Sequence, residues 1–384
     1  MKAITAYTAE IDDASAAVSE ILAQLDMAQN LRAHSVGLIS CYSEFIESGV
    51  VKAICEALPF DVIGCTTAGS AVSGMLGELI LCLIALTGDE LVFSAGASEP
   101  LIPEPEAALA EAYRQVREKL PGEPSLMIAF TPFVKNVPGE RVIEIFSGIC
   151  PELPIFGAQA IDYIDIKQFT KTYTFFNGES RRDAVAFLLI YGDIHPAFFT
   201  ASLSEVCIQK QKAVVTKSEG NRVIEVNGMP LLLYLEKIGM SGVDMGTSLS
   251  FPFMVDYRDG TKPVPRASYT ATPEGHMVFG GRIPVGAMLA VGDMDYQDVL
   301  ATAKELLGTV IAQKGSCILL FSCLMRYLIL GADTVAEMEL TRAAIGKRKP
   351  YYFLYSGGEF CPVRNERGRL VNRFHNCTVI ACVL

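Results

Sequence analysis

Three stretches of the chain share one order of hydrophobic and polar segments. In each, a short apolar run breaks into a polar turn, a helix-like segment follows, a second run ends at or near glycine, and a long apolar run closes the pattern. The first runs are residues 36–41, 126–131 and 318–323. Repetition at this scale predicts three equivalent units whose corresponding turns gather in one place.

Each unit is predicted to have the order β-α-β-α-β-β. Asp12 or Asp13 can cap the first helix, and Asp295 can cap a helix over 296–312. Strands that alternate with helices predict the α/β class, with mixed β-sheets flanked by helices. The expected strands are 3–7, 35–41, 61–65 and 78–87 in unit one, 91–96, 125–131, 154–157 and 184–191 in unit two, and 286–291, 317–323, 351–355 and 377–383 in unit three.

A region of different character, roughly 193–285, is inserted between units two and three. A hairpin is predicted from 213–216 and 222–226, and a helix from Pro230 onward. Residues 239–275 are rich in Gly, Ser, Thr and Pro, which favours loops. We place the domain boundary after residue 228, so that 1–228 holds two units plus the hairpin and 229–384 holds the loop-rich insert plus the third unit.

The composition favours a folded protein and argues against a nucleic-acid-binding surface and a membrane span. Of the 384 residues, 51% are hydrophobic and 20% charged, which is typical of a folded chain. The formal net charge of -11 argues against a nucleic-acid surface. The most apolar stretch, 317–330, is too short to span a membrane and contains Arg326, and the start of the chain lacks an apolar signal-peptide core. These features predict a cytoplasmic protein without a membrane span.

Cysteine and histidine usage argues against a metal site. The eleven cysteines lie mostly in apolar runs without a Cys-x-x-Cys pair, and only four histidines are present. This pattern is typical of buried thiols in a reducing compartment, so no metal is expected.

Four short motifs along the chain resemble those of a known protein family. Residues 64–69 (GCTTAG) resemble a turn of FIST N-terminal domains, whereas 321–326 (FSCLMR), 358–360 (GEF) and 375–378 (HNCT) resemble the FIST C-terminal domain. The resemblance covers nearly the whole chain. It implies an intracellular sensory module that binds a small ligand such as an amino acid and signals to a protein such as a kinase or cyclase, here encoded separately. It also implies an alternative, a haem-binding gas sensor.

Charged residues gained in the third unit are the best site candidates. Arg326 and Glu359 each follow an apolar strand, and ligands in α/β folds usually lie at such strand ends. A guanidinium group binds a carboxylate and a carboxylate accepts from an ammonium group, so this pair suits a free amino acid. The alternative is that Arg326 and Glu359 bridge each other structurally.

Further residues at these turns complete the predicted ligand-binding set. Cys323 and Cys65 are interpreted as equivalent strand-end thiols, and a thiol near Arg326 can acquire a lowered pKa. The main hypothesis is a sensory protein that is not an enzyme and has no cofactor; haem and a cysteine-dependent enzyme centred on Cys323 are the alternatives. The remaining members of the predicted set are Thr66, Gly358, His375 and Asn376.

Overall fold

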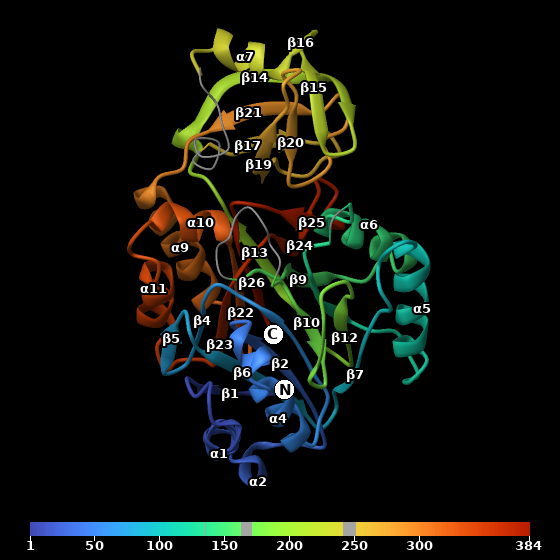
Figure 1. The fold of residues 1–384 in the computed structure, drawn as a ribbon, viewed down its shortest axis with the longest axis vertical. Helices are drawn as coiled ribbons and strands as arrows, with labels where there is room; N and C mark the ends of the chain where they lie inside the picture. The colour runs from blue at the N-terminus through green and yellow to red at the C-terminus, as the bar shows by residue number, and fades with distance from the viewer. Residues whose placement is uncertain (135, 163–170, 241–250) are drawn as a thin grey trace.

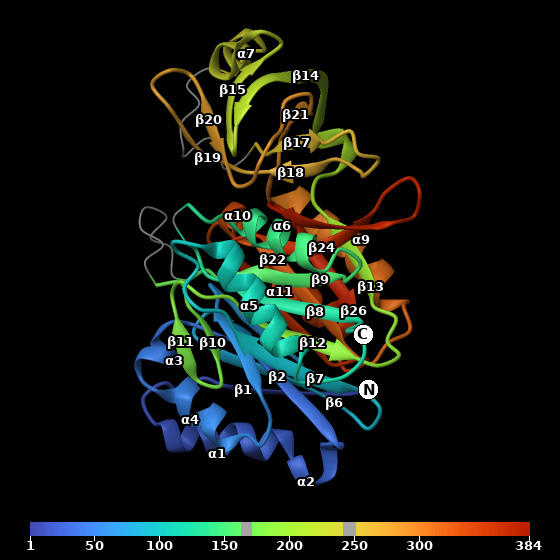
Figure 2. The same ribbon diagram turned by 90° about the vertical axis from the view of Figure 1, so that its right-hand side faces the viewer.

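The computed structural model describes residues 1–134, 136–162, 171–240 and 251–384. Figures 1 and 2 show a larger part, the core, in which helices surround three sheets, and a smaller β-rich part at one end. The smaller part, called the β insert below, is formed by the chain from Glu205 to Gly292. The fold is α/β with mixed sheets, as the sequence predicts.

The core contains three units built in the same order. Unit one consists of β1 (Lys2–Thr8), α1 (Ala14–Leu25), α2 (Met27–Asn30), β2 (His34–Cys41), α3 (Glu44–Glu47), α4 (Val50–Ala57), β3 (Val62–Thr66), β4 (Ser70–Val72), β5 (Met75–Gly77) and β6 (Leu81–Gly88). Unit two consists of β7 (Val92–Ala97), α5 (Pro105–Arg117), β8 (Leu126–Thr131), α6 (Gly139–Ile149), β9 (Ile155–Gln159), β10 (Thr174–Phe176), β11 (Glu179–Arg181) and β12 (Ala186–Tyr191). Unit three consists of β13 (Ala197–Ala201), α9 (Tyr296–Ile311), β22 (Ile318–Cys323), α10 (Leu324–Leu330), α11 (Ala336–Ile345), β23 (Tyr351–Ser356), β24 (Glu359–Arg364), β25 (Leu370–His375) and β26 (Val379–Val383).

The three sheets have one topology. Their strand orders begin β1-β6-β2-β3, β7-β12-β8-β9 and β13-β26-β22-β23. In each sheet the last two of these strands pair in parallel and the other neighbours pair antiparallel. The runs 36–41, 126–131 and 318–323 therefore occupy equivalent positions, which confirms the repeat prediction.

A hairpin from a different unit completes each sheet. β4-β5 of unit one pairs with β23, β10-β11 of unit two pairs with β3, and β24-β25 of unit three pairs with β9. The sequence analysis missed these hairpins, so each unit has two strands more than predicted. One signal was available: Asn177 and Gly178 both have positive φ, 51° and 84°, in the two-residue turn that an Asn-Gly pair favours.

The sheets enclose a shared core and carry helices on their outer faces. Along β2, Leu38 packs into the central cluster drawn from all three sheets, and the next residue, Ile39, packs under the helices. Figure 1 shows α1 and α4, α5 and α6, and α9 and α11 around this centre. Because both faces are covered, the strands are hydrophobic in runs. The predicted caps are confirmed, since Asp13 accepts from the backbone of Ser15 and Asp295 from that of Asp298.

The β insert corrects two predictions. The run 286–291, expected as the first strand of unit three, lies in β21 (Met288–Gly292) of the insert sheet, and β13 takes its place in unit three. The predicted hairpin and helix are confirmed as β14 (Ile208–Glu219), β15 (Arg222–Val226) and α7 (Leu231–Lys237). Part of the expected loop region, 239–275, instead forms strands, although its residues 241–250 lie outside the described residues. The other insert elements are η1 (Glu205–Cys207), β16 (Met229–Pro230), β17 (Phe253–Asp256), β18 (Val264–Arg266), β19 (Ser268–Ala271) and β20 (Met277–Phe279).

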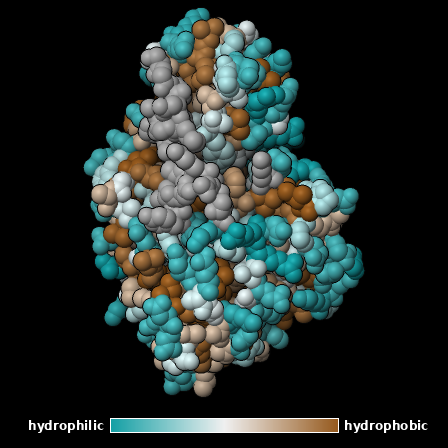
Figure 3. Space-filling view, viewed as in Figure 1, coloured by the Kyte–Doolittle hydropathy of each residue, from teal (hydrophilic) through white to brown (hydrophobic). Residues whose placement is uncertain are grey.

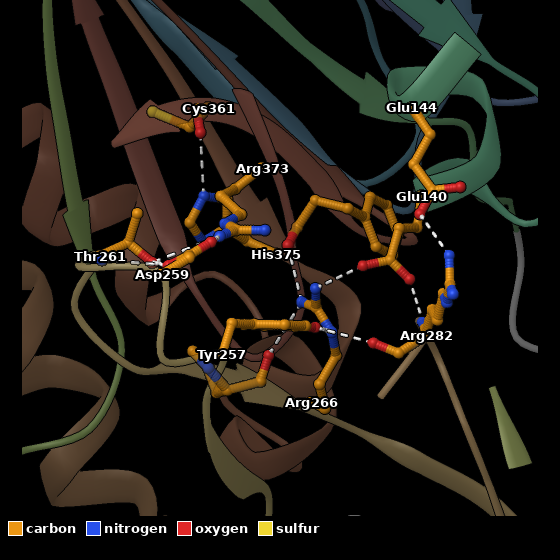
Figure 4. A network of polar contacts seen from close by, with 12 residues as sticks. Glu140, Glu144, Tyr257, Asp259, Thr261, Arg266, Arg282, Cys361, Arg373 and His375 are labelled. Atoms are coloured by element: carbon orange, nitrogen blue, oxygen red, sulfur yellow. Dashed lines mark hydrogen bonds and ion pairs between the residues drawn. The ribbon is translucent and has the colours of Figure 1, made fainter. Parts of the chain in front are cut away.

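A polar network fastens the insert to the core. Arg266, fully buried on β18, donates through Nη2 to Glu140 Oε1 at 2.9 Å and through Nη1 to the carbonyl oxygen of Phe374 at 2.6 Å. Its Nε donates to the Tyr257 hydroxyl at 3.0 Å. Figure 4 shows the Arg266 guanidinium group directed at Glu140 on α6 and the Tyr257 hydroxyl directed at the Arg282 carbonyl oxygen. Breaking a buried ion pair of this kind is strongly destabilising, so the network fixes the junction of the two parts.

On the part of the face in Figure 3 that is coloured by hydropathy, hydrophobic residues lie scattered among hydrophilic ones. Isolated exposed hydrophobic side chains are normal for a folded domain and need no partner. Among the described residues the large exposed hydrophobics are Leu79, Ile102, Val206, Leu233 and Val285.

Candidate functional site

The parallel strands of the three units end close together. The backbone N–H of Tyr355 donates to Gly69 at 2.9 Å, that of Ile161 to Thr66 at 3.1 Å, and that of Gly357 to Gln159 at 2.8 Å. Each of these bonds joins two different units. The corresponding turns therefore gather in one place, as the repeat predicts.

Arg326 lies in the first turn of α10 and is fully buried. Its Nε and Nη2 donate to Glu337 Oε1 at 3.0 and 2.7 Å. Nη2 also donates to the Val299 carbonyl oxygen at 2.7 Å, and Nη1 donates to Thr302 Oγ1 at 3.2 Å and to the Ser202 carbonyl oxygen at 3.4 Å. A guanidinium has five N–H donors, and these five bonds use all of them.

Both carboxylate oxygens of Glu337 accept hydrogen bonds from protein groups. Its second carboxylate oxygen, Oε2, accepts from Ser322 Oγ at 2.7 Å. We call Arg326, Glu337, Ser322 and Thr302 the Arg326 cluster. The structure thus pairs Arg326 with Glu337 on α11, and not with Glu359 as the structural alternative supposed.

Glu359 begins β24 and is also fully buried. Its Oε1 accepts from Ser356 Oγ at 2.6 Å, whereas its Oε2 has no hydrogen-bond partner in the described part of the chain. Burial raises the pKa of this carboxyl group well above its usual range, and the side chains of Ser356 and Cys323 and the charge of Arg326 only partly oppose the rise. Burial therefore favours the neutral carboxyl group over the carboxylate in the folded protein.

Asn376 directly follows β25 and is fully buried as well. Its Oδ1 has no hydrogen-bond partner within the described ranges. Gly280 of the insert approaches it so closely that an added Cβ would lie 2.6 Å from Asn376 Oδ1 and 2.8 Å from the hydroxyl oxygen of Tyr269. A glycine at position 280 thus brings groups of the insert and of the core together.

Cys323 and Cys377 complete the surroundings of Glu359. Both thiols pack in one cluster with Tyr269. Burial raises the pKa of the Cys323 thiol well above its usual range. The lowered thiol pKa expected from Arg326 is therefore wrong. We call Tyr269, Cys323, Glu359, Asn376 and Cys377 the Glu359 cluster.

His375 lies across the strand pair from Glu359, with which it is in register. Its Nε2 is 3.0 Å from the carbonyl oxygen of Cys361. Burial lowers the pKa of His375 to about 3, so the imidazole is neutral at physiological pH. The ring lines a cavity of 490 Å³ between the insert and the core.

Gly358 has a structural reason to be glycine. A Cβ at this position would lie 2.2 Å from the ring of Phe374. Its carbonyl oxygen accepts from the backbone N–H of Gln159 at 2.8 Å, which joins units two and three. Gly358 therefore fixes the position of the backbone directly before Glu359.

Cys65 and Thr66 lie apart from this group. Cys65 packs in the central cluster, and Thr66 Oγ1 accepts from the backbone N–H of Tyr173 at 3.0 Å. The parallel register pairs Ser40 with Cys65 and Ser322 with Tyr355, so Cys65 corresponds to Tyr355 in unit three and not to Cys323. The proposed equivalence of the two cysteines is wrong.

The structure brings together Cys323, Glu359 and Asn376 from the predicted set and adds residues that the sequence analysis missed. Cys377 belongs to the motif 375–378, so the sequence offered a reason to include it in the predicted ligand-binding set. Tyr269 and Gly280 carry no local signal, because only the folding of the insert onto the core brings them to Glu359.

His375 directs its Nε2 at a backbone carbonyl group, and His34 and His195 are exposed. Over the described ranges no group of three or more His, Cys, Asp or Glu side chains could hold a metal ion. Within the same ranges no helix is long and apolar enough to cross a membrane.

The protein thus has a three-unit α/β core and an inserted β-sheet. Between them lies a buried polar cluster in which two oxygen atoms have no hydrogen-bond partner among the described residues. The FIST N domain matches residues 35–229 and the FIST C domain matches residues 230–362. The chain therefore belongs to the FIST family. Comparison with curated proteins gives no match. FIST domains are generally regarded as sensory, signal-transduction domains, and FIST is not a known enzyme family.

Proposed function

We propose that this protein is a sensory module that binds a small polar ligand at the Glu359 cluster. The observation that carries the proposal is the pair of fully buried oxygens, Glu359 Oε2 and Asn376 Oδ1, that have no partner in the described structure. A buried polar group left unsatisfied costs about 1–3 kcal/mol. A ligand that donates to both oxygens recovers that free energy.

The position of the cluster supports a signalling role. Tyr269 and Gly280 belong to the insert, whereas Cys323, Glu359 and Asn376 belong to the core. A ligand that contacts both sides stabilises one placement of the insert relative to the core. That placement is then available to a signalling partner such as a separately encoded kinase or cyclase, in the cytoplasm.

The chemistry of the site favours binding over catalysis. A cysteine nucleophile needs a thiolate, and burial raises the pKa of both Cys323 and Cys377. His375 is held by a backbone carbonyl group and is not placed as a base for Cys323. These features support a receptor and disfavour a cysteine-dependent enzyme.

A thermal-shift screen with a steric variant tests the proposal. Free amino acids and small carboxylates are screened, and a hit at a hundredfold excess over its dissociation constant stabilises the folded state by about 2.7 kcal/mol. Gly280→Ala places a methyl group against Asn376 and Tyr269 and should abolish the shift. Gly308→Ala is the matched control, because a Cβ there meets nothing within 4 Å.

Two outcomes contradict the proposal. One is the absence of any shift in the wild-type protein, and the other is a shift that persists in Gly280→Ala. Arg326→Ala is not a suitable probe, because it leaves Glu337 as a buried charge without its partner and destabilises the unliganded protein.

A further inference from the structure

The unpaired groups of the Glu359 cluster are two oxygen atoms, and both are hydrogen-bond acceptors once Glu359 is a carboxylate. Glu359 Oε2 and Asn376 Oδ1 have no donors from the described residues, and both Asn376 Oδ1 and the Tyr269 hydroxyl lie next to Gly280. An ammonium group carries three N–H donors and no acceptor. It is therefore the complement of such a set.

The nearby cations do not complement an anionic ligand. Arg326 uses all five of its donors on protein groups. At the junction with the insert, Arg266 donates through Nε to Tyr257, through Nη1 to Phe374 and through Nη2 to Glu140. A ligand carboxylate in the Glu359 cluster would lack a dedicated cation, so the zwitterion suggested by the sequence fits less well than a plain amine.

Resting on the function proposed above, we propose that the Glu359 cluster binds the protonated amino group of a small primary amine, and that Glu359 releases its proton as the amine binds. In this step the neutral carboxyl group and an alkylammonium ion form a carboxylate–ammonium pair, and the proton passes to solvent. No covalent bond to carbon forms or breaks. Burial makes the lone carboxylate unfavourable, and the ammonium charge removes that cost.

Glu359 is the group in this cluster whose protonation changes. The Cys323, Cys361 and Cys377 thiols and the Tyr269 hydroxyl all have a pKa raised by burial and remain neutral. On the helical side, Arg326 of α10 and Glu337 of α11 are paired with each other. His375, on the neighbouring strand, has a pKa lowered to about 3 by burial and is also neutral.

Calorimetric titration with primary alkylamines from methylamine to butylamine tests the inference. Alkylammonium ions keep their charge from pH 6 to 8, as a lysine side chain does. We expect at least one amine to bind, with about one proton released per amine when buffers of different ionisation enthalpy are compared. Its affinity should rise by about tenfold per pH unit while Glu359 is neutral in the free protein. The matched carboxylates, acetate to pentanoate, should not bind.

Variants separate the inference from the proposed function. Glu359→Gln retains shape and neutrality but cannot form a carboxylate, so amine binding should weaken at least tenfold at pH 8 and lose its pH dependence. Glu366→Gln, in the exposed β24-β25 turn, is the control and should behave as the wild type. Absence of amine binding, or amine binding without proton release and with unchanged affinity in Glu359→Gln, overturns the inference. Binding of an uncharged or anionic compound that Gly280→Ala abolishes would leave the proposed function standing and show that the ligand class is wrong.

Discussion

Two buried polar clusters of unit three lie near each other and differ in one respect. In the Arg326 cluster every donor of the guanidinium group and both oxygens of Glu337 have protein partners. In the Glu359 cluster Glu359 Oε2 and Asn376 Oδ1 have none among the described residues. Arg326 and Glu359 are both fully buried, so burial alone does not separate a structural group from a binding site.

The two clusters are distinguished by whether all their buried polar atoms have hydrogen-bond partners. A satisfied buried ion pair fixes the packing of α10 against α9 and α11 and has nothing left to offer a ligand. A cluster with unpaired polar atoms can still bind a ligand through them, but those atoms lower the stability of the unliganded protein. The two clusters therefore predict opposite responses to the same kind of substitution.

The largest expected effect is that of Glu337→Gln. This change removes the negative charge opposite Arg326 and leaves the guanidinium charge buried, which should lower the free energy of unfolding by about 3–5 kcal/mol. Urea denaturation at pH 7 measures the loss. Glu339→Gln, whose side chain is exposed two residues further along α11, is the control and should change stability by less than about 1 kcal/mol.

A second variant shows whether the loss comes from the uncompensated charge. Arg326→Met combined with Glu337→Leu removes both charges and should be more stable than Glu337→Gln alone. A loss below about 1 kcal/mol in Glu337→Gln would mean that the Arg326 cluster is not the structural member of the comparison.

The sequence predicted the local features of this fold well. The strands of the three units, the caps at Asp13 and Asp295, and the hairpin of the insert each depend on residues close together in the chain. The family followed from motifs spread over both domains. Such features can be read from hydrophobic periodicity and turn chemistry, because they do not depend on distant partners.

Apart from the missed hairpins and the strands in the expected loop region, the features that failed depend on contacts distant in sequence. The exchange of hairpins places β4 beside β23, and Leu354 pairs with Ser70 although nearly the whole chain separates them. Arg326 was correctly marked as unusual, yet its partner, Glu337, could not be chosen over Glu359 without the positions of α10 and α11. The role of Gly280 follows only from its approach to Asn376.

A smaller effect is expected for Glu359→Gln, in contrast to Glu337→Gln. Because burial favours the neutral form of the Glu359 carboxyl group, the amide preserves the favoured charge state and the bond with Ser356. At pH 7 the variant should be at least as stable as the wild type. Urea denaturation of both proteins between pH 4 and 8 measures the difference.

The sign of the pH dependence follows from the raised pKa of Glu359. The unfolded carboxyl group ionises near its ordinary value, whereas the folded group stays protonated. The wild type should therefore lose stability as pH rises from about 4.5 toward the folded pKa, by up to about 1.4 kcal/mol per pH unit from this group. Glu359→Gln should lack that component. Identical pH profiles for the two proteins would show that Glu359 is ionised in the fold.

The smallest expected effect concerns the thiols. Ten of the eleven cysteines are buried and only Cys207 is partly exposed, so a thiol reagent should modify the native protein at no more than one site. Intact-mass analysis should show one label at most under native conditions, eleven in denaturant, and none in native Cys207→Ser. Protection of Cys323 agrees with a neutral, packed thiol beside Glu359. Labelling of Cys323 at a rate like that of Cys207 would instead indicate an accessible thiolate, and would make the Glu359 cluster a reactive centre and not a binding site.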